Sequence, residues 1–179
     1  MKKVAIVVGH WPTSIDGGAY NDDLKISEFD FNNPLAALVC ERLRQHNVLP
    51  VLMYRETYDN LPDQINQTNV DVCAELHCNA HNGSTSGAEV LYYYNSANGK
   101  RLAECIQPRL VACMGESDRG VKPRQKGQDG YHLLVGTSMP TVIVESLFID
   151  NTQSLERGLE RREALADAIA LGIVEFLEG

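Results

Sequence analysis

Residues 141–146 read Thr-Val-Ile-Val-Glu-Ser, a short run of β-branched side chains that leads into an acid. Such a run is typical of a strand that is buried on both faces, as in the centre of a parallel sheet. Two further runs of this kind are KVAIVV at residues 3–8 and VDVCAELH at residues 70–77. Because helical patterns separate these runs, the sequence predicts an α/β fold, a single domain with a twisted, largely parallel central sheet flanked by helices.

The segments around these runs continue the alternation of strands and helices. Further strands are expected at residues 48–53 and 88–94, and Pro50 favours a sheet edge for the first of them. Residues 115–130 are polar and are expected to form a loop. Later helices are expected at residues 61–69, at residues 100–113 despite Pro108, and around the apolar positions Leu165, Ile169, Ile173, Phe176 and Leu177.

The first helix has two candidate starts. Its apolar face is formed by Leu35, Leu38, Val39 and Leu43, and Asn33-Pro34 would serve as N-cap and first helical position. Ser27, with Asp30 three residues later, also fits an N-cap, but that start would place Pro34 inside the helix. The sequence leaves both starts open.

The composition is that of an ordinary globular protein. The chain has 179 residues, which suits one domain over residues 1–179. Hydrophobic residues make up 44% and charged residues 22%, which argues against disorder. Sixteen Lys and Arg against 24 Asp and Glu give a net charge of −8, so no nucleic-acid partner is expected.

Neither a targeting segment nor a membrane span is expected. The first apolar run covers only Val4–Val8 and is followed by Gly-His-Trp-Pro, without a small-residue cleavage site. No stretch approaches the roughly 18 apolar residues of a membrane span. The protein is therefore expected to remain at first in the cytoplasm.

The cysteines point to a reduced protein. There are five, with no C-x-x-C pair, and most lie in apolar runs. They are expected to be buried thiols rather than disulfides or zinc ligands.

Three of the apolar strands lead into side chains that can bind a metal or carry a proton. His10 follows the first, His77 ends the second and Glu145 lies near the end of the third. Ligands of open α/β sheets bind at the carboxyl ends of the strands, so these side chains are expected to share one crevice. Glu28 precedes the first helix, where a loop would bring it to the same rim.

Two imidazoles and one carboxylate with an open fourth position form a common catalytic zinc set. A second carboxylate beside such a zinc ion can accept the proton of an attacking water. Taken singly, a histidine at a strand end is more often a structural residue, and Glu28 reads as an ordinary surface acid. A charge at Glu145 is harder to dismiss, because a carboxylate in so apolar a strand needs a partner.

The other histidines are weaker candidates. His77 and His81 form H-x-x-x-H, but the residue after His77 is Cys78 rather than glutamate, and the segment reads as strand into turn. His81 is therefore not expected to bind metal, and His46 is expected to be solvated at a helix end. His132 follows a glycine-containing loop and is a candidate for lining the cleft.

Four blocks of the chain carry a resemblance to a known family. They are VVGH at residues 7–10, SEF at 27–29, ELHCNA at 75–80 followed by GAEVLYY at 87–93, and MPTVIVESLFIDN at 139–151. In this order they resemble the zinc-dependent N-acetylmuramoyl-L-alanine amidases of the type 3 family, especially the compact catalytic domains of phage endolysins. The similarity runs from about residue 2 to 177.

The resemblance implies one zinc ion bound by His10, Glu28 and His77, with Glu145 as the catalytic acid and base. It implies hydrolysis of the amide between N-acetylmuramic acid and L-alanine, with the stem peptide and glycan of peptidoglycan as partners. No protein partner is predicted. It also implies a phage or prophage endolysin that is stored in the cytoplasm until a holin opens the membrane. A lytic enzyme of a bacterial mother cell would look the same.

Two departures from the family pattern bear on the site. Trp11-Pro12 stands where many members have Gly-Gly, which is expected to reshape the rim of the cleft. Glu75 stands where many have serine, two residues before His77 and so on the same strand face. Glu75 either orients His77 from behind or is a separately satisfied buried acid.

The segment RGVKPRQK at residues 119–126 carries four cations in an acidic protein. It is either a solvated loop or a cleft wall that meets the carboxylates of the stem peptide, in which case Arg124 binds substrate. Asn79 and His132 are further candidates for substrate binding. Two rival functions are a zinc carboxypeptidase acting on free peptides and a non-catalytic wall-binding module, although the latter would not need all four site residues.

Overall fold

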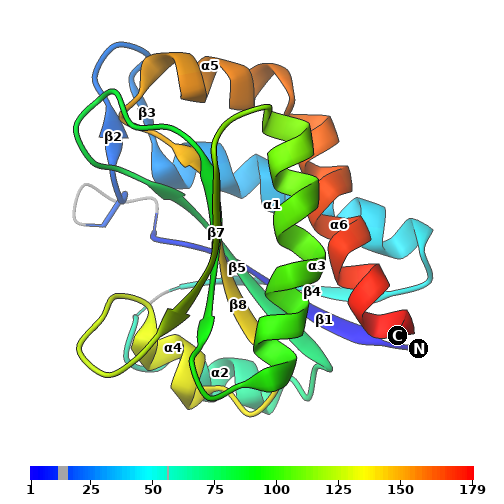
Figure 1. The fold of residues 1–179 in the computed structure, drawn as a ribbon. Coiled ribbons are helices and arrows are strands. Elements are labelled where there is room, and N and C mark those ends of the chain that lie inside the picture. The colour runs from blue at the N-terminus through cyan, green and yellow to red at the C-terminus, as the bar shows by residue number, and fades with distance from the viewer. Residues whose placement is uncertain (12–15, 56) are drawn as a thin grey trace.

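A computed structural model describes residues 1–11, 16–55 and 57–179 of the chain. Its main sheet has six strands in the order β4-β1-β5-β8-β6-β7 (Figure 1). In chain order these strands are β1 Lys3–Val8, β4 Leu49–Tyr54, β5 Val72–Asn79, β6 Ala88–Tyr93, β7 Asp118–Arg124 and β8 Thr141–Phe148. A separate two-stranded hairpin is formed by β2 Tyr20–Asn21 and β3 Ile26–Ser27.

The sheet is largely parallel, as expected. β4, β1, β5 and β8 are parallel neighbours, whereas β6 pairs antiparallel with β8 and parallel with β7. The three runs that predicted the fold are β1, β5 and β8, which lie side by side at its centre. Pro50 lies in β4 at the sheet edge, where its missing N–H is tolerated.

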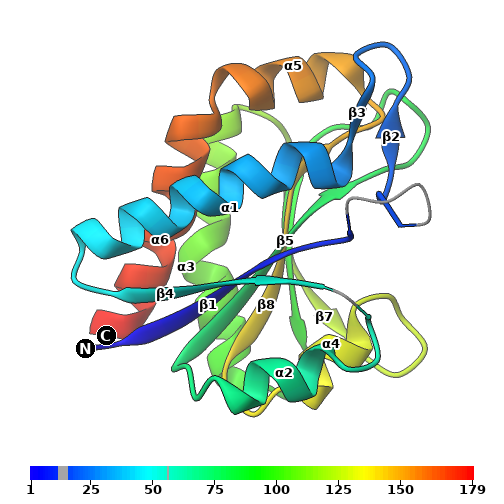
Figure 2. The ribbon, with the colours of Figure 1, turned by 180° about the vertical axis from the view of Figure 1, so that it is seen from behind.

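Helices cover the two faces of the sheet unequally (Figures 1 and 2). One face packs against the long helices α1, α3 and α6 and forms the larger apolar core. The other face packs against the short helices α2 and α4 and forms a smaller core. The helices are α1 Glu28–Gln45, α2 Leu61–Gln67, α3 Ala97–Met114, α4 Tyr131–Gly136, α5 Thr152–Glu160 and α6 Arg162–Glu178.

Helix α1 begins at the earlier of its two candidate starts. The Ser27 hydroxyl accepts a hydrogen bond from the Asp30 N–H, and the Asp30 carboxylate accepts one from the Ser27 N–H. This reciprocal capping box satisfies two backbone donors at the helix start. Pro34 therefore lies inside the helix. The early start makes Glu28 the first helical residue and so sets the position of its side chain.

The expectation of a polar loop over residues 115–130 was wrong in its central part. Residues 118–124 form β7, an edge strand that pairs only with β6 among the described strands. Such a strand needs no continuous apolar run, because one of its edges and part of its surface face solvent. The hairpin β2-β3 and helices α4 and α5 were also not predicted, and all four are short.

Two smaller expectations can be compared with the structure. Cys40, Cys73 and Cys78 are buried, Cys105 and Cys113 are half-buried, and all five are free thiols. Among the described residues, no helix is long and apolar enough to cross a membrane.

Candidate active site

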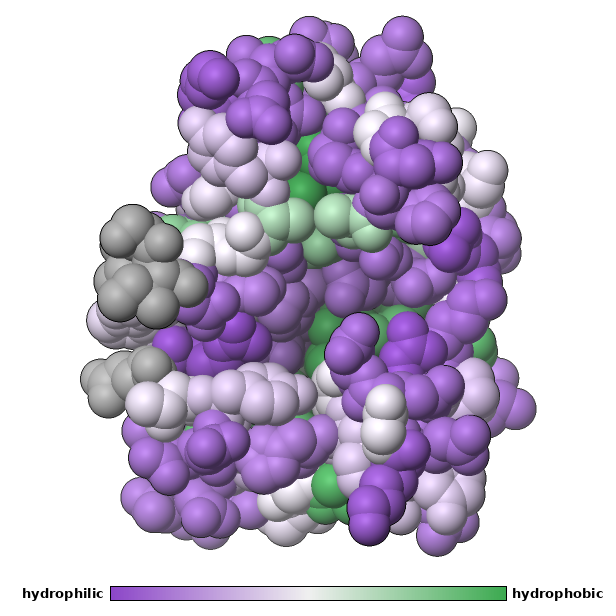
Figure 3. Space-filling model, turned by 90° about the vertical axis from the view of Figure 1, so that its left-hand side faces the viewer, coloured by the Kyte–Doolittle hydropathy of each residue, from purple (hydrophilic) through white to green (hydrophobic). Residues whose placement is uncertain are grey.

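A cleft of about 670 Å³ opens over the sheet face that carries α2 and α4. Figure 3 shows it as a hollow in which both hydrophilic and apolar side chains are exposed. Its walls come from the ends of β1 and β4, the start of α1, the centres of β5 and β8, and the loop before α4. The charged and imidazole side chains that line it are His10, Glu28, Arg55, Glu75, His77, Asp129, His132 and Glu145.

The four residues singled out by the strand-end argument and the resemblance meet in this cleft. His10 lies just beyond β1, whereas His77 and Glu145 lie within β5 and β8, directly opposite each other in the parallel register. Both strands continue past these residues, by two residues after His77 and by three after Glu145, so the prediction that each strand ends at its site residue was wrong. Ligand atoms of His10, Glu28 and His77 all lie within 4.8 Å of one another.

The Glu28 carboxylate is buried between the two imidazoles. Its Oε1 lies 2.7 Å from His77 Nδ1, and its Oε2 lies 3.3 Å from His10 Nε2. The Cys78 and Ala19 N–H groups also donate to it, at 2.9 and 3.2 Å. Burial disfavours its ionisation, but the hydrogen bonds and charges of His10 and His77 outweigh burial and hold the pKa of Glu28 well below its usual range.

Two glycines allow these side chains to approach so closely. A Cβ added at Gly9 would lie 2.5 Å from Nε2 of His77. A Cβ at Gly18 would lie 2.6 Å from Cδ2 of His10 and 2.7 Å from Oε2 of Glu28. Gly18 also has a φ of +76°, a conformation that other residues rarely adopt. The backbone at both positions therefore forms the wall against which the cluster packs.

The cluster has the chemistry of a zinc site. A buried carboxylate and two imidazoles of limited exposure present nitrogen and oxygen donors to one another without an intervening apolar side chain. Two histidines and one glutamate are a donor set that zinc takes in hydrolases, with a further position left for water or substrate. The residues present therefore fit a zinc ion.

Glu145 is half-buried beside this cluster. Its Oε2 is buried and has no hydrogen-bond partner among the described residues. Burial is the main cause that raises the pKa of Glu145 to about 7; His77 opposes the rise, and Glu28, Glu89 and Glu75 add to it. A free carboxyl oxygen thus stands next to the three clustered donors.

The remaining predicted residues lie at different distances from this centre. Asn79 lines the cleft, and its amide donates to Glu89 at 2.9 Å. His132 is exposed at the cleft rim, where its Nε2 lies 3.2 Å from the Asp59 carbonyl oxygen. Glu75 is fully buried, with Oε2 3.1 Å from His77 Nε2.

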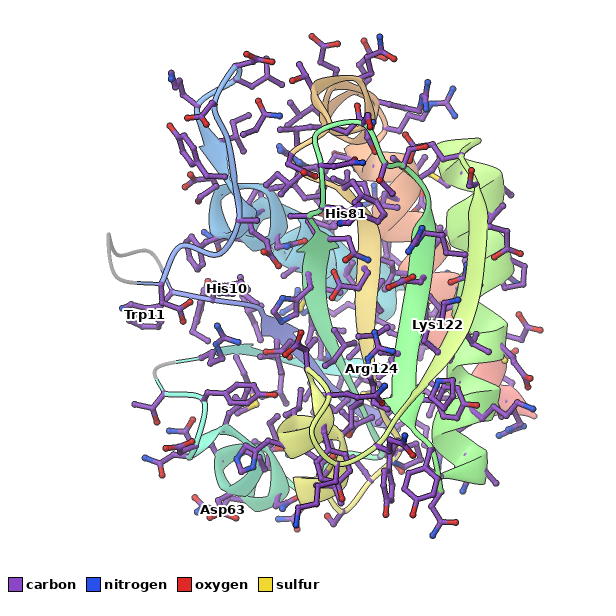
Figure 4. All side chains as sticks on the ribbon, turned by 60° about the vertical axis from the view of Figure 1, so that its left-hand side comes forward. His10, Trp11, Asp63, His81, Lys122 and Arg124 are labelled. Carbon is purple, nitrogen blue, oxygen red and sulfur yellow. The ribbon has the colours of Figure 1, made fainter. Side chains whose placement is uncertain are left out.

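The cationic segment contributes less to the cleft than expected. Arg119 is paired with Glu89, to which its Nε donates a hydrogen bond at 2.9 Å. Arg124, at the end of β7, does not line the cleft. It pairs with Tyr93, which packs on the smaller core, so Arg124 stands on the same sheet face as the cleft. Figure 4 shows Lys122 and Arg124 on β7, across the sheet from His10.

The two histidines set aside on sequence grounds lie outside the cluster. His46 caps the carboxyl end of α1 and is exposed. His81 is exposed, and its backbone N–H donates to Asp150. Of the unusual pair after His10, Trp11 makes an edge contact with Tyr54, and Pro12 lies outside the described residues.

Sequence reasoning missed Asp16 and Arg55, which contact His10. Asp16 Oδ1 lies 2.7 Å from His10 Nδ1, and Arg55 donates to Asp16 Oδ2 at 2.8 Å. Arg55 directly follows β4, so the strand-end argument that found His10 would have found it too. Asp16 carries no comparable signal, because it follows no apolar run of the sequence.

Comparison with known proteins places this cleft in a family. The sequence profile of the N-acetylmuramoyl-L-alanine amidase family matches residues 4–175. The chain is 32% identical over 170 residues to N-acetylmuramoyl-L-alanine amidase LytC of Bacillus subtilis, a match that covers 90% of this chain and 33% of LytC. It is 28% identical over 185 residues to the uncharacterized protein YqiI of the same organism, covering 99% of this chain and 85% of YqiI.

A solved structure agrees with the sequence comparison. The catalytic domain of CwlV, an N-acetylmuramoyl-L-alanine amidase from Bacillus (Paenibacillus) polymyxa var. colistinus, superposes with a TM-score of 0.85 at 25% identity, and the match covers 99% of each chain. This chain thus spans about a third of the length of LytC and nearly all of the CwlV domain.

Proposed function

Because this chain belongs to the N-acetylmuramoyl-L-alanine amidase family, we propose that it hydrolyses the amide bond between N-acetylmuramic acid and L-alanine in peptidoglycan. Residues 1–179 form the catalytic domain in this proposal, and one zinc ion is held by His10, Glu28 and His77. The observation that carries the proposal is the clustering of these three donors within 4.8 Å of one another in a cleft that also contains Glu145.

The chain's own residues have distinct tasks in this reaction. When bound, zinc would polarise the amide carbonyl and lower the pKa of water, as in other zinc hydrolases. Glu145 accepts a proton from the water that attacks the carbonyl carbon. It then delivers that proton to the leaving nitrogen of L-alanine as the carbon–nitrogen bond breaks. The products are a lactyl carboxylate on the sugar and a peptide with a free amino terminus.

The substrate lies along the cleft in this proposal. Asn79 stands two residues beyond His77 on the same strand and contacts the glycan or peptide next to the scissile bond. His132 contacts substrate at the rim. Arg124 meets a carboxylate of the stem peptide farther along the sheet face, which requires a substrate that extends beyond the cleft.

We further propose a biological role as a phage or prophage endolysin that a holin releases to the wall. A bacterial autolysin is the second candidate, and it is favoured by the similarity to a Bacillus subtilis amidase. Expression in a bacterial cytoplasm with and without a co-expressed holin distinguishes them. Lysis that requires the holin supports the endolysin, whereas lysis without one contradicts it.

The activity is tested on purified peptidoglycan, with and without a zinc chelator. We expect new amino-terminal L-alanine on peptides freed from glycan, and loss of this product with the chelator. Glu145→Gln is expected to lower the rate by at least about 100-fold, since a lost general base typically costs 10²–10⁴-fold. It should retain zinc, because Glu145 is not among the three clustered donors.

Glu160→Gln, at an exposed position in α5, is the matched control and should keep the parental rate. A product with free carboxy-terminal amino acids and no new L-alanine amino group would indicate a carboxypeptidase instead. Wall binding without any product would indicate a binding module. Full activity in the chelator or in Glu145→Gln would overturn the mechanism.

A further inference from the structure

Three charged side chains behind the imidazoles have no task in the hydrolysis described above. They are Asp16, Arg55 and Glu75. Arg55 and Glu75 are buried, with 8% and 0% of their surface exposed, and neither position is explained by core packing. Buried charges are costly unless they are paired, so their grouping at this site calls for a reason.

Each imidazole lies between two carboxylates. His10 has Glu28 on its Nε2 side, at 3.3 Å, and Asp16 on its Nδ1 side, at 2.7 Å. His77 has Glu28 on its Nδ1 side, at 2.7 Å, and Glu75 on its Nε2 side, at 3.1 Å. The two rings therefore turn opposite nitrogens toward the shared carboxylate of Glu28.

Arg55 connects the two outer carboxylates. Its Nη2 donates to Asp16 Oδ2 at 2.8 Å, and its Nη1 lies 4.0 Å from Glu75 Oε1. Neither oxygen of Glu75 has a hydrogen-bond partner among the described residues, and the cationic or imidazole groups near them are Arg55 and His77. The guanidinium is thus the cation that compensates Glu75 in the interior.

The carboxylates on the outer side of each ring favour a proton on the outer nitrogen. Arg55 Nη2 lies 2.8 Å from His10 Nδ1 as well, but a guanidinium can only donate and an ionised carboxylate can only accept. Because the Asp16 carboxylate can only accept, its 2.7 Å contact with His10 Nδ1 is made by a proton on Nδ1. His77 Nδ1 lies 2.7 Å from Glu28 and its Nε2 lies 3.1 Å from Glu75. A zinc ion bound at Nδ1 would replace any proton there, and the ring proton would then stand on Nε2, facing Glu75.

We propose that Arg55 is the positioning residue of the metal site. It holds Asp16 and Glu75 against the outer nitrogens of His10 and His77, so that both rings present their lone pairs toward Glu28. Zinc would then be bound through Nε2 of His10 and Nδ1 of His77. This inference rests on the proposed zinc site, and it adds Arg55, Asp16 and Glu75 as determinants of zinc affinity.

The inference is tested by zinc affinity, measured by competition with a chromophoric chelator on the parent and on Arg55→Gln, Glu75→Gln and Asp16→Asn. Partners of metal-binding histidines typically contribute 10–100-fold, so each variant is expected to bind zinc about 10–100-fold more weakly. The double variant Arg55→Gln with Glu75→Gln should lose less than the product of the two single losses, because the residues act through one contact.

Two further measurements separate positioning from a merely structural role. Long-range proton–nitrogen NMR of the zinc-loaded parent should find the proton on Nδ1 of His10 and on Nε2 of His77. The melting temperatures of the zinc-free proteins show whether a variant has lost its fold. Glu75→Gln is expected to melt near the parent, because it removes a buried charge while keeping the shape of the side chain. Arg119→Gln is the matched control, because Arg119 pairs with Glu89 and not with a carboxylate that contacts an imidazole.

The inference would be overturned if folded Arg55→Gln and Glu75→Gln bound zinc with affinities within about twofold of the parent. It would also be overturned if the protons were found on Nε2 of His10 and Nδ1 of His77, or if the parent took up no zinc. These outcomes are separate from those of the peptidoglycan assay. A parent that binds zinc and shows these losses, yet releases no L-alanine amino groups, would sustain the inference and contradict the proposed amidase.

Discussion

At the scale of single residues, the site depends on backbone that has no room for side chains. His10 itself has a φ of +66°, which is uncommon for a residue other than glycine. Gly9 and Gly18 lie directly against the His77 ring and against His10 and Glu28. Strained or crowded backbone of this kind is found where the surrounding structure holds a functional geometry in place.

Gly18→Ala is expected to disturb the cluster more than the backbone. The new methyl group would lie 2.6 Å from His10 and 2.7 Å from Glu28, so at least one of these two side chains must move. We expect zinc affinity to fall by about tenfold or more, on the scale of lost support to a metal ligand. The free energy of unfolding should fall by roughly 1–3 kcal/mol, from strain and overpacking. Chelator competition and thermal melting measure the two effects.

Gly127→Ala provides the matched control for this variant. Gly127 also has a positive φ, of +89°, but a Cβ there would meet nothing within 4 Å. It should lose about 1 kcal/mol of stability from strain alone and keep the parental zinc affinity. Equal zinc affinities for Gly18→Ala and Gly127→Ala would contradict the role assigned to Gly18.

Part of the candidate site could be predicted from the sequence, residue by residue. His10, His77 and Glu145 were found by their places after or near the ends of apolar runs, because parallel neighbours bring such positions to one edge. Glu28 was placed near them only as a candidate until the family resemblance was added. Asp16 had no local pattern at all, because its position is decided by a contact with Arg55 across the loop.

At the scale of elements, the local sequence and the contacts with other elements can favour different secondary structures. The capping box at Ser27 and the buried face of α1 outweigh the cost of Pro34 within the helix. Residues 118–124 are the opposite case, because their local sequence disfavours a strand. They contain Gly120 and Pro123 and have little apolar character, but they form β7. Pairing with β6 decides their structure, and no local pattern of the sequence reports that pairing.

The cationic strand β7 leads to a prediction about substrate choice. Lys122 and Arg124 have no ion-pair partner among the residues that the structure describes. They stand two strands from Glu145, and the register places Lys122 two residues and Arg124 four residues along the sheet from its level. The backbone separations are therefore roughly 12 and 16 Å, the span of about four to five extended residues. The double variant Lys122→Gln with Arg124→Gln should therefore lower kcat/KM by about 5–10-fold on stem peptides with free carboxylates, since exposed charge pairs contribute up to about 1 kcal/mol each.

The comparison that decides this prediction uses stem peptides whose carboxylates are amidated. The variant should cleave these at the parental rate, and its defect on free carboxylates should shrink at high salt because exposed charges are screened. Lys100→Gln, on α3 and paired with Glu104, is the control for loss of one surface cation. An equal loss on both kinds of peptide would exclude carboxylate recognition by β7.

At the scale of the whole molecule, the unequal cover of the sheet produces the cleft. The long helices α1, α3 and α6 close one face, and the short helices α2 and α4 leave much of the other open. The α/β class follows from the sequence pattern, but the inequality does not, because α4 has only six residues and no recognisable periodicity. The open face also receives site side chains from β5 and β8, namely Glu75, His77, Asn79 and Glu145.

This inequality predicts that the two cores open separately. Cys40 lies in the larger core and Cys73 in the smaller one, and both are buried. Burial raises the pKa of Cys40 to about 11 and also raises that of Cys73, so both thiols should be unreactive in the native protein near pH 8. Because α2 and α4 are short, their layer should open at a lower free-energy cost than global unfolding.

Pulsed thiol labelling in increasing urea, read out for each cysteine by mass spectrometry, tests this order of opening. We expect Cys105 and Cys113, which are half-buried, to label without urea, Cys73 to label next, and Cys40 to label only in the main unfolding transition. Circular dichroism recorded on the same samples locates that transition. If Cys73 and Cys40 label together at its midpoint, the molecule unfolds as one cooperative unit and the smaller core has no separate stability.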